Sequence, residues 1–188
     1  IRYRRLSQIE EGFGITMQPL EKLAREVYED DPATRFQTRG TGLRDAAQMA
    51  RMQKAIAVIQ FKLEAQAIAR HPEYQMHHRA LINQINLKHG TVILDGREYP
   101  LTDASLPSLD PRDPSALSTE EAACMQRLKR SFLESHNLFE RIHFVAQRGN
   151  SYLIRDGHVI FHGCVPADET AAFLPLQVDG APSQGRAL

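Results

Sequence analysis

Apolar residues recur at three- and four-residue steps through the first half of the chain, and this spacing predicts helices. The first predicted helix runs from Met17 to Glu29, with Thr16 as its N-cap residue and Pro19 in its first turn. The longest predicted helix ends at His71, because Pro72 disfavours helical geometry at the residue before it. Its apolar stripe comprises Leu43, Ala46, Ala50, Met52, Ile56, Ile59, Leu63 and Ala67. We interpret the side chains of Met49, Met52 and Phe61 as core packing rather than as a ligand-binding stripe.

Three further elements are predicted between residues 74 and 134. Residues 74–86 give a short helix, and residues 91–101 give a β-hairpin whose Asp95–Gly96 turn accepts positive φ angles. Ser118 and Glu121 form a capping box that begins an amphipathic helix. The residues of this helix expected to face the core are Ala122, Met125, Leu128, Phe132 and Leu133.

The last third of the chain changes to the period of two that is typical of strands. Residues 141–147, 151–155 and 158–163 read as three short strands, the last two joined by an Asp156–Gly157 turn. We therefore predict an α+β chain. It has a largely helical part over residues 1–140, which includes the hairpin 91–101, and an antiparallel β-meander within residues 141–188.

Net charge, apolar runs and cysteine spacing indicate which kinds of partner and cellular setting the sequence favours. The 188 residues carry 23 basic and 23 acidic side chains, so the formal net charge is zero and no strong electrostatic drive toward nucleic acid or an anionic membrane is visible. No apolar run approaches the ~18–20 residues of a membrane helix, and no signal-peptide pattern is present. Cys124 and Cys164 do not form a CxxC motif, which favours reduced thiols and a cytoplasmic setting.

The segment VIFHGCVP at residues 159–166 carries the one candidate for metal chemistry. His162 ends an apolar strand, Gly163 permits close approach of another group, and Pro166 fixes the exit of the loop. Asp168 and Glu169 follow on a loop that could reach the same region. From these residues alone, His162 is either a packed imidazole at a turn or a metal ligand, because no second and third ligands stand at persuasive spacing.

The other candidate side chains favour structural interpretations. His77 and His78 are adjacent on a helix and point about 100° apart, which makes them poor partners for one ion. The Cβ atoms of His158 and His162 would lie about 13 Å apart on one strand, so His158 reads as a solvated turn neighbour. His143 likewise reads as a satisfied or exposed imidazole on its strand.

Three arginines are candidates for contact with a substrate phosphate. Arg35, Arg39 and Arg44 flank a glycine-punctuated loop, where a solvated basic loop is favoured over contact with a substrate phosphate. No HExxH, P-loop, GxSxG or Gly-rich dinucleotide motif is present. The residues alone identify neither a catalytic residue nor a cofactor-binding one.

Two long segments carry a family resemblance. KAIAVIQFKLEAQAIARHP (residues 54–72) and GNSYLIRDGHVIFHGCVPADE (residues 149–169) closely resemble the class III, Firmicutes-type fructose-1,6-bisphosphatases of the calcineurin-like metallophosphoesterase superfamily. The resemblance implies an enzyme of gluconeogenesis that hydrolyses the 1-phosphate of a sugar bisphosphate, fructose 1,6-bisphosphate. It implies two metal ions, typically Mn²⁺, with His162 as one metal ligand, and leaves homo-oligomerisation open.

The resemblance also has departures. The family motifs Asp-x-His-Gly, Gly-Asp-x-x-Asp-Arg-Gly, Gly-Asn-His-Asp and Gly-His-Thr are all missing from these 188 residues. We therefore expect an internal fragment, inactive alone. Residues 1–140 would be a helical insertion over the active site, and residues 141–188 a partial core of a calcineurin-like α/β sandwich. The alternatives are a non-catalytic interaction domain derived from the phosphatase, and a metallophosphoesterase with another phosphate-ester substrate.

Overall fold

The structure, a computed structural model, describes residues 1–3, 5–39, 45–150, 152–161, 163, 166–178 and 180–184. Helices and small antiparallel sheets occur together, as the α+β prediction requires. The chain divides into two units, residues 1–139 and residues 140–188, and each is described by itself. Among the described residues, no helix combines the length and the apolar character needed to cross a bilayer.

Helix α3 (Ala46–Arg70) is the central element of the first unit. The carboxylate of Asp45 accepts a hydrogen bond from the Gln48 amide at 3.0 Å, which caps its first turn. The helix ends where Pro72 predicts, because His71 already has non-helical angles (φ −126°, ψ 63°). Met49 and Met52 are fully buried, as predicted, but Phe61 is 42% exposed, so its assignment to the core was wrong.

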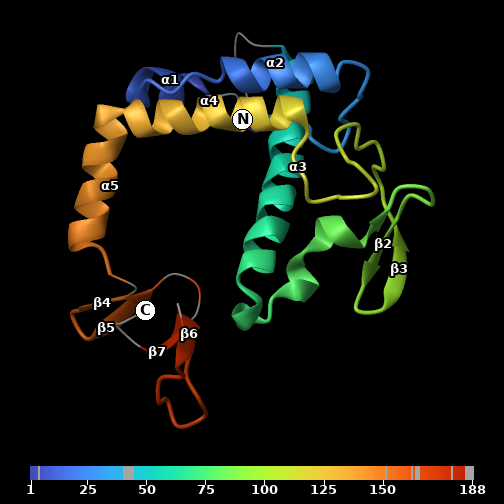
Figure 1. Cartoon of the computed structure of the whole chain (residues 1–188). Coiled ribbons are helices and arrows are strands. Elements are labelled where there is room, and N and C mark those ends of the chain that lie inside the picture. Colours follow the sequence, from blue (N-terminus) through green and yellow to red (C-terminus); the bar gives the residue numbers. More distant parts are fainter. Residues whose placement is uncertain are drawn as a thin grey trace. The chain divides into compact units, whose positions relative to one another are not determined.

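Helices α1 (Ser7–Phe13) and α2 (Gln18–Val27) precede α3, and Figure 1 shows α2 beside α4 (Thr119–Glu134) near one end of α3. The position before the first helical residue of α2 is Met17 rather than the predicted Thr16, although the Thr16 hydroxyl accepts a hydrogen bond from the Gln18 amide at 3.2 Å. Apolar side chains of these helices and of the residues next to α1 and α2 form the main core. Its buried members are Leu6, Ile15, Met17, Leu20, Leu23, Ala24, Tyr28, Met49, Met52, Ala55, Ile59, Cys124 and Leu128.

The segment after α3 differs from the predicted helix over residues 74–86. It forms three 3₁₀ turns, η1 (Pro72–Tyr74), η2 (His77–Arg79) and η3 (Leu81–Gln84), followed by the short strand β1 (Ile85–Asn86). The segment packs against α3 and covers a second, smaller core around Ile68 and Ile82. The predicted continuous helix is therefore replaced by short 3₁₀ turns that pack against α3.

The first hairpin confirms its prediction. Strands β2 (Thr91–Leu94) and β3 (Arg97–Pro100) pair antiparallel, and β1 adds to the other edge of β2. Asp95 and Gly96 take φ angles of 49° and 74°, the left-handed pair that a two-residue turn of this kind requires.

Helix α4 has the predicted capping box: the Ser118 hydroxyl accepts from the Glu121 amide, and the Glu121 carboxylate accepts from the Ser118 amide. Its buried stripe, however, is Glu121, Cys124 and Leu128, with Met125 packed against the core. The prediction was wrong for the other apolar residues, since Ala122, Phe132 and Leu133 are exposed. Phe132 and Leu133 lie in the last turn of α4, beyond Leu128, its last buried residue.

Helix α5 (His136–Arg148) replaces the strand predicted over residues 141–147. Ser135 separates it from α4, and its hydroxyl accepts from the Leu138 amide at 3.3 Å, as an N-cap residue does. The same hydroxyl donates to the Phe13 carbonyl oxygen of α1. A cap with a tertiary anchor therefore starts a helix in a stretch whose Ile, Phe and Val residues favour strands.

In the described part of the second unit, two separate hairpins occur in place of the predicted meander. Strand β4 (Tyr152–Arg155) pairs with β5 (His158–Phe161) through the predicted Asp156–Gly157 turn. Strand β6 (Leu176–Val178) pairs with β7 (Ala181–Ser183), a hairpin that was not predicted although the sequence carries a third Asp–Gly pair there.

Candidate functional site

Two lysines on α3 are almost completely buried: Lys54 is 1% exposed and Lys62 is not exposed at all. A buried ammonium group is costly unless it is paired and hydrogen-bonded. Sequence reasoning missed both residues, because a lysine on a long helix normally faces water. The available signal was their position eight residues apart, one on each side of the apolar run AIAVIQF.

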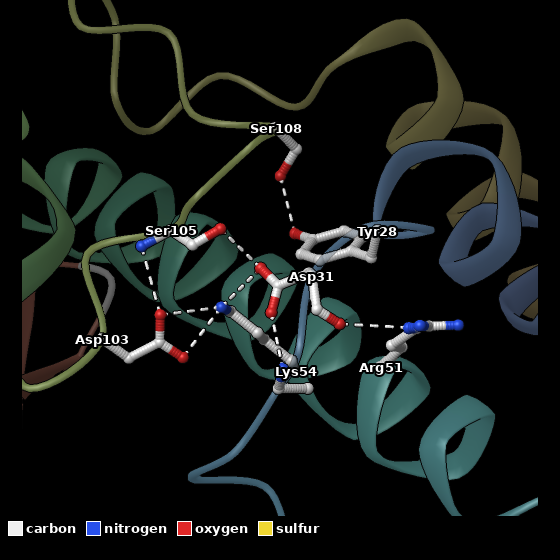
Figure 2. A network of polar contacts seen from close by, with 8 residues as sticks. Tyr28, Asp31, Arg51, Lys54, Asp103, Ser105 and Ser108 are labelled. Atoms are coloured by element: carbon white, nitrogen blue, oxygen red, sulfur yellow. Dashed lines mark hydrogen bonds and ion pairs between the residues drawn. The ribbon is translucent and has the colours of Figure 1, made fainter.

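Lys54 holds two carboxylates together (Figure 2). Its Nζ atom donates to Asp31 Oδ2 at 2.7 Å and to the two carboxylate oxygens of Asp103 at 2.9 and 2.8 Å. Asp31 lies in the loop that follows α2, and Asp103 follows strand β3. One ammonium group thus joins α3 to two segments that are far apart in sequence.

Further hydrogen bonds fix the orientation of Asp31. Its carboxylate accepts from the Ala33 amide at 2.8 Å and from the Ser105 hydroxyl at 2.7 Å. The Arg51 Nε donates to its main-chain carbonyl oxygen at 3.1 Å. Ala33 has a φ of 44°, so this contact holds a non-glycine residue in the left-handed region.

Lys62 forms the second network, two helical turns further along α3. Its Nζ donates to Glu121 Oε2 and to the Ser108 carbonyl oxygen, each at 2.7 Å. The Ser108 hydroxyl donates to Glu121 Oε1 at 2.6 Å and also contacts the Tyr28 hydroxyl at 2.9 Å. The carboxylate that completes the capping box of α4 is therefore the partner of a buried ammonium as well.

Burial and hydrogen bonding oppose each other at Asp31. Burial by itself would raise the pKa of its carboxyl, but hydrogen bonds from Lys54, Ser105 and the Ala33 amide outweigh burial and hold that pKa below its ordinary value. At Tyr28, burial raises the pKa of the phenol to about 12, against the hydrogen bond to Ser108. Tyr28 is therefore neutral, and Asp31 is ionised, near pH 7.

We expect the stability of the first unit to fall in acid because of Asp31. A carboxyl with a lowered folded-state pKa stabilises the fold above its unfolded value of about 4, and this contribution is lost as the pH falls through the folded-state pKa. Urea unfolding followed by helical circular dichroism between pH 7 and pH 3 measures this loss. Asp31→Asn should be less stable at pH 7 and should lose less stability in acid. Asp30→Asn, at an exposed neighbour, should keep the wild-type profile.

The two networks tether one irregular segment to α3. Residues 101–118, which we call the tethered loop, connect β3 to α4. Lys54 holds its Asp103, Lys62 holds the carbonyl of Ser108, and Gln66 Nε2 donates to the carbonyl of Ser115 at 2.7 Å. Lys54 and Lys62 are each paired with a carboxylate. We therefore assign both networks to the architecture of the first unit and not to acid–base chemistry.

A cavity of about 240 Å³ opens beside Lys54. Its walls are mainly apolar, with Phe61, Ile82 and Leu106 among them, and Arg35 and Asp103 add the polar groups at its lining. Arg35 and Arg39 are exposed, and Arg44 lies outside the described residues. The solvated-loop interpretation of Arg35 and Arg39 agrees with this exposure.

His162 lies outside the described residues, so its predicted role as a metal ligand stays a prediction. Within the part of the chain that is described, no group of three His, Cys, Asp or Glu side chains is placed to hold a metal ion. Gly163 has a φ of 87°, a conformation that favours glycine. Asp168 accepts hydrogen bonds from the Thr170 and Ala172 amides, at 2.8 and 3.0 Å, within its own loop.

The other candidate histidines are exposed, and His143 and His158 contact residues of their own segments. His143 is on α5 and not on a strand, and its Nε2 contacts Gln147 at 3.2 Å. His158 is exposed, with its Nδ1 2.9 Å from the Asp156 carbonyl oxygen, in agreement with a turn neighbour. His77 and His78 are exposed on the 3₁₀ turn η2.

Comparison with known proteins identifies the family to which the chain belongs. Residues 1–188 match the family described as Firmicute fructose-1,6-bisphosphatase, and the chain therefore belongs to that family. The relatives include proteins named fructose-1,6-bisphosphatase class 3 from Clostridium novyi (39% identical), Clostridium acetobutylicum (38%) and Listeria innocua (36%). Each alignment covers 100% of this chain but only 29% of the relative, so the chain spans less than a third of the length of these proteins. No solved structure matches the chain.

Proposed function

We propose that these residues belong to a metal-dependent fructose-1,6-bisphosphatase, which hydrolyses the 1-phosphate of fructose 1,6-bisphosphate to give fructose 6-phosphate and phosphate. The observation that carries the proposal is the match to this family over residues 1–188, together with relatives of that name at 36–39% identity. The reaction belongs to gluconeogenesis, and we place the protein in the cytoplasm.

Within that enzyme, we assign residues 1–140 to a helical insertion and residues 141–188 to part of a calcineurin-like phosphatase core. The described residues of the chain do not assemble a metal centre by themselves. The chain's contribution would be a single ligand, His162, which directly follows strand β5 in the sequence. Two divalent ions of the Mn²⁺ type, when bound, supply positive charge that stabilises in-line attack of water on the phosphorus atom.

Metal removal tests the proposal on the full-length protein. Phosphate release from fructose 1,6-bisphosphate should fall by roughly 100-fold or more after chelation and dialysis, and added Mn²⁺ should restore it. Fructose 6-phosphate and a panel of other phosphate monoesters are the matched substrates. A higher kcat/KM on another ester would move the protein to a different phosphoesterase activity, and hydrolysis that survives complete metal removal would contradict the metal assignment.

A further inference from the structure

The cavity beside Lys54 is lined by charged groups of opposite sign as well as by apolar side chains. Arg35 is exposed and supplies a positive charge, and Asp103 supplies a negative one. Among the described residues, Arg35 forms no ion pair, with Asp103 or with any other carboxylate. Two groups of opposite charge thus line one cavity without pairing with each other.

The carboxylate of Asp103 has room for a second cationic partner. Its Oδ1 accepts from Lys54 Nζ at 2.9 Å and from the Ser105 amide at 3.1 Å. Its Oδ2 accepts from Lys54 at 2.8 Å and from no other described residue, although a carboxylate oxygen has two acceptor sites. The Asp103 side chain is 19% exposed, and it shares the single ammonium group of Lys54 with Asp31. Arg51 is bound to the main-chain carbonyl of Asp31 and does not line the cavity.

Arg35 lies on a turn that is fastened to the same network. The Ala33 amide donates to the Asp31 carboxylate at 2.8 Å, and the Phe36 amide donates to the Ala33 carbonyl oxygen at 2.9 Å. A guanidinium group can form two parallel hydrogen bonds with one carboxylate. The long, exposed side chain of Arg35 is therefore suited to bind the carboxylate group of a ligand at the cavity.

The remaining walls of the cavity are mainly apolar. Helix α3 contributes Val58 and Phe61, η3 contributes Ile82, and the tethered loop contributes Leu106. Phe61 is 42% exposed, so an apolar group seated here would remove part of its ring from water. An apolar cavity of about 150 Å³ holds a molecule of the size of benzene. The cavity of about 240 Å³ therefore has space for one branched aliphatic side chain or one aromatic ring.

We propose that this cavity binds a free apolar α-amino acid of the leucine or phenylalanine type. Its side chain would lie against Phe61, its carboxylate would pair with Arg35, and its ammonium group would donate to Asp103. A simple apolar acid would bring a second negative charge beside Asp103, and a simple amine would leave Arg35 unpaired. The site lies within the first unit and does not depend on the proposed phosphatase function.

Calorimetric titration of the full-length protein with L-phenylalanine and L-leucine tests the proposal. At least one of them should bind with a Kd of about 1 mM or tighter. 3-Phenylpropionate lacks the ammonium group and 2-phenylethylamine lacks the carboxylate, so each should bind roughly 10-fold or more weakly than L-phenylalanine. Glycine, without an apolar side chain, should not bind detectably. Failure of both amino acids to bind, or equal binding of either analogue, overturns the proposal.

Two substitutions locate the bound amino acid. Arg35→Gln should raise the Kd by roughly 10-fold or more, because it removes the partner of the carboxylate. Ala57→Phe fills the cavity from α3 and should abolish binding. Arg39→Gln, at an exposed arginine that does not line the cavity, is the matched control and should change the Kd by less than about twofold. Unchanged binding in the Arg35 and Ala57 variants would place the ligand elsewhere and contradict the proposal.

Hydrogen exchange in the unsubstituted protein covers the case in which a variant does not fold. Saturating L-phenylalanine should slow exchange in residues 33–36 and 101–106, which carry Arg35 and Asp103. Protection confined to other residues would overturn the assignment to this cavity. Slow exchange of both segments without any bound amino acid would show that another part of the full-length protein fills the cavity, and this too would remove the inference.

Discussion

Replacing Lys62 with methionine lowers the free energy of unfolding of the first unit by about 3–5 kcal/mol, the cost expected when one partner of a buried ion pair is removed. The side chains of Lys62 and Glu121 are both completely buried, with their charged atoms 2.7 Å apart. Methionine keeps the length and apolar character of the lysine stem but leaves the Glu121 carboxylate buried without its cation. The carbonyl of Ser108 loses its donor at the same time.

Cys124 gives this unfolding experiment a native probe. It is buried on α4, and burial raises the pKa of its thiol to about 11, so it should react only after local or global opening. The urea dependence of its labelling measures the loss of stability. Lys22→Met is the matched control, because the Lys22–Glu26 pair is exposed and 3.6 Å apart and should change stability by about 0.5 kcal/mol or less. If the two substitutions lowered the free energy of unfolding equally, burial of the Lys62–Glu121 pair would not explain the effect.

If the full-length protein has the proposed activity, replacing His162 with alanine should lower its kcat/KM for fructose 1,6-bisphosphate by roughly 100-fold or more. Mutating a residue that only hydrogen-bonds to a metal ligand typically lowers activity or metal affinity by about 10- to 100-fold. Removing a direct ligand should therefore have a larger effect. Metal content per subunit, measured by elemental analysis, should fall with activity. His78→Ala, at an exposed histidine on η2, should leave both quantities within about twofold of the unsubstituted enzyme. Normal metal content in the His162 variant would remove the ligand assignment.

Sequence motifs of a few residues correctly predicted helix ends and turns whose conformation depends only on neighbouring residues. The end of α3 before Pro72, the Asp95–Gly96 turn and the capping box of α4 each depend on a few neighbouring residues, and the structure confirms all three. Residues 141–147 were predicted wrongly because their composition favours a strand, whereas the cap at Ser135 and its contact with Phe13 lie outside that window. The spacing of Leu138, Ile142 and Val145 was the available helical signal.

The buried lysines and the metal ligand could not be predicted from neighbouring residues alone. Burial of Lys54 and Lys62 depends on carboxylates that are 23 to 59 residues away in sequence, so their spacing around the apolar run could indicate burial but could not identify the partners. The structure describes the strand that leads to His162 but not His162 itself. The proposed metal centre would be assembled from several distant motifs of the full-length protein, and this chain holds one predicted ligand, His162.

The way in which α3 holds the tethered loop has a consequence for protein engineering. Lys62 and Gln66 bind main-chain carbonyl groups, at Ser108 and Ser115, and every amino acid has such a group. Substituting the side chain of Ser115 would leave its anchor in place, whereas substituting Gln66 would release it. At these two anchors the path of the loop therefore depends on side chains of the helix, whereas the anchor at Lys54 also needs the carboxylate of Asp103. The exposed positions between the anchors, such as Pro107 and Arg112, are therefore suited to epitope tags or fluorescent labels.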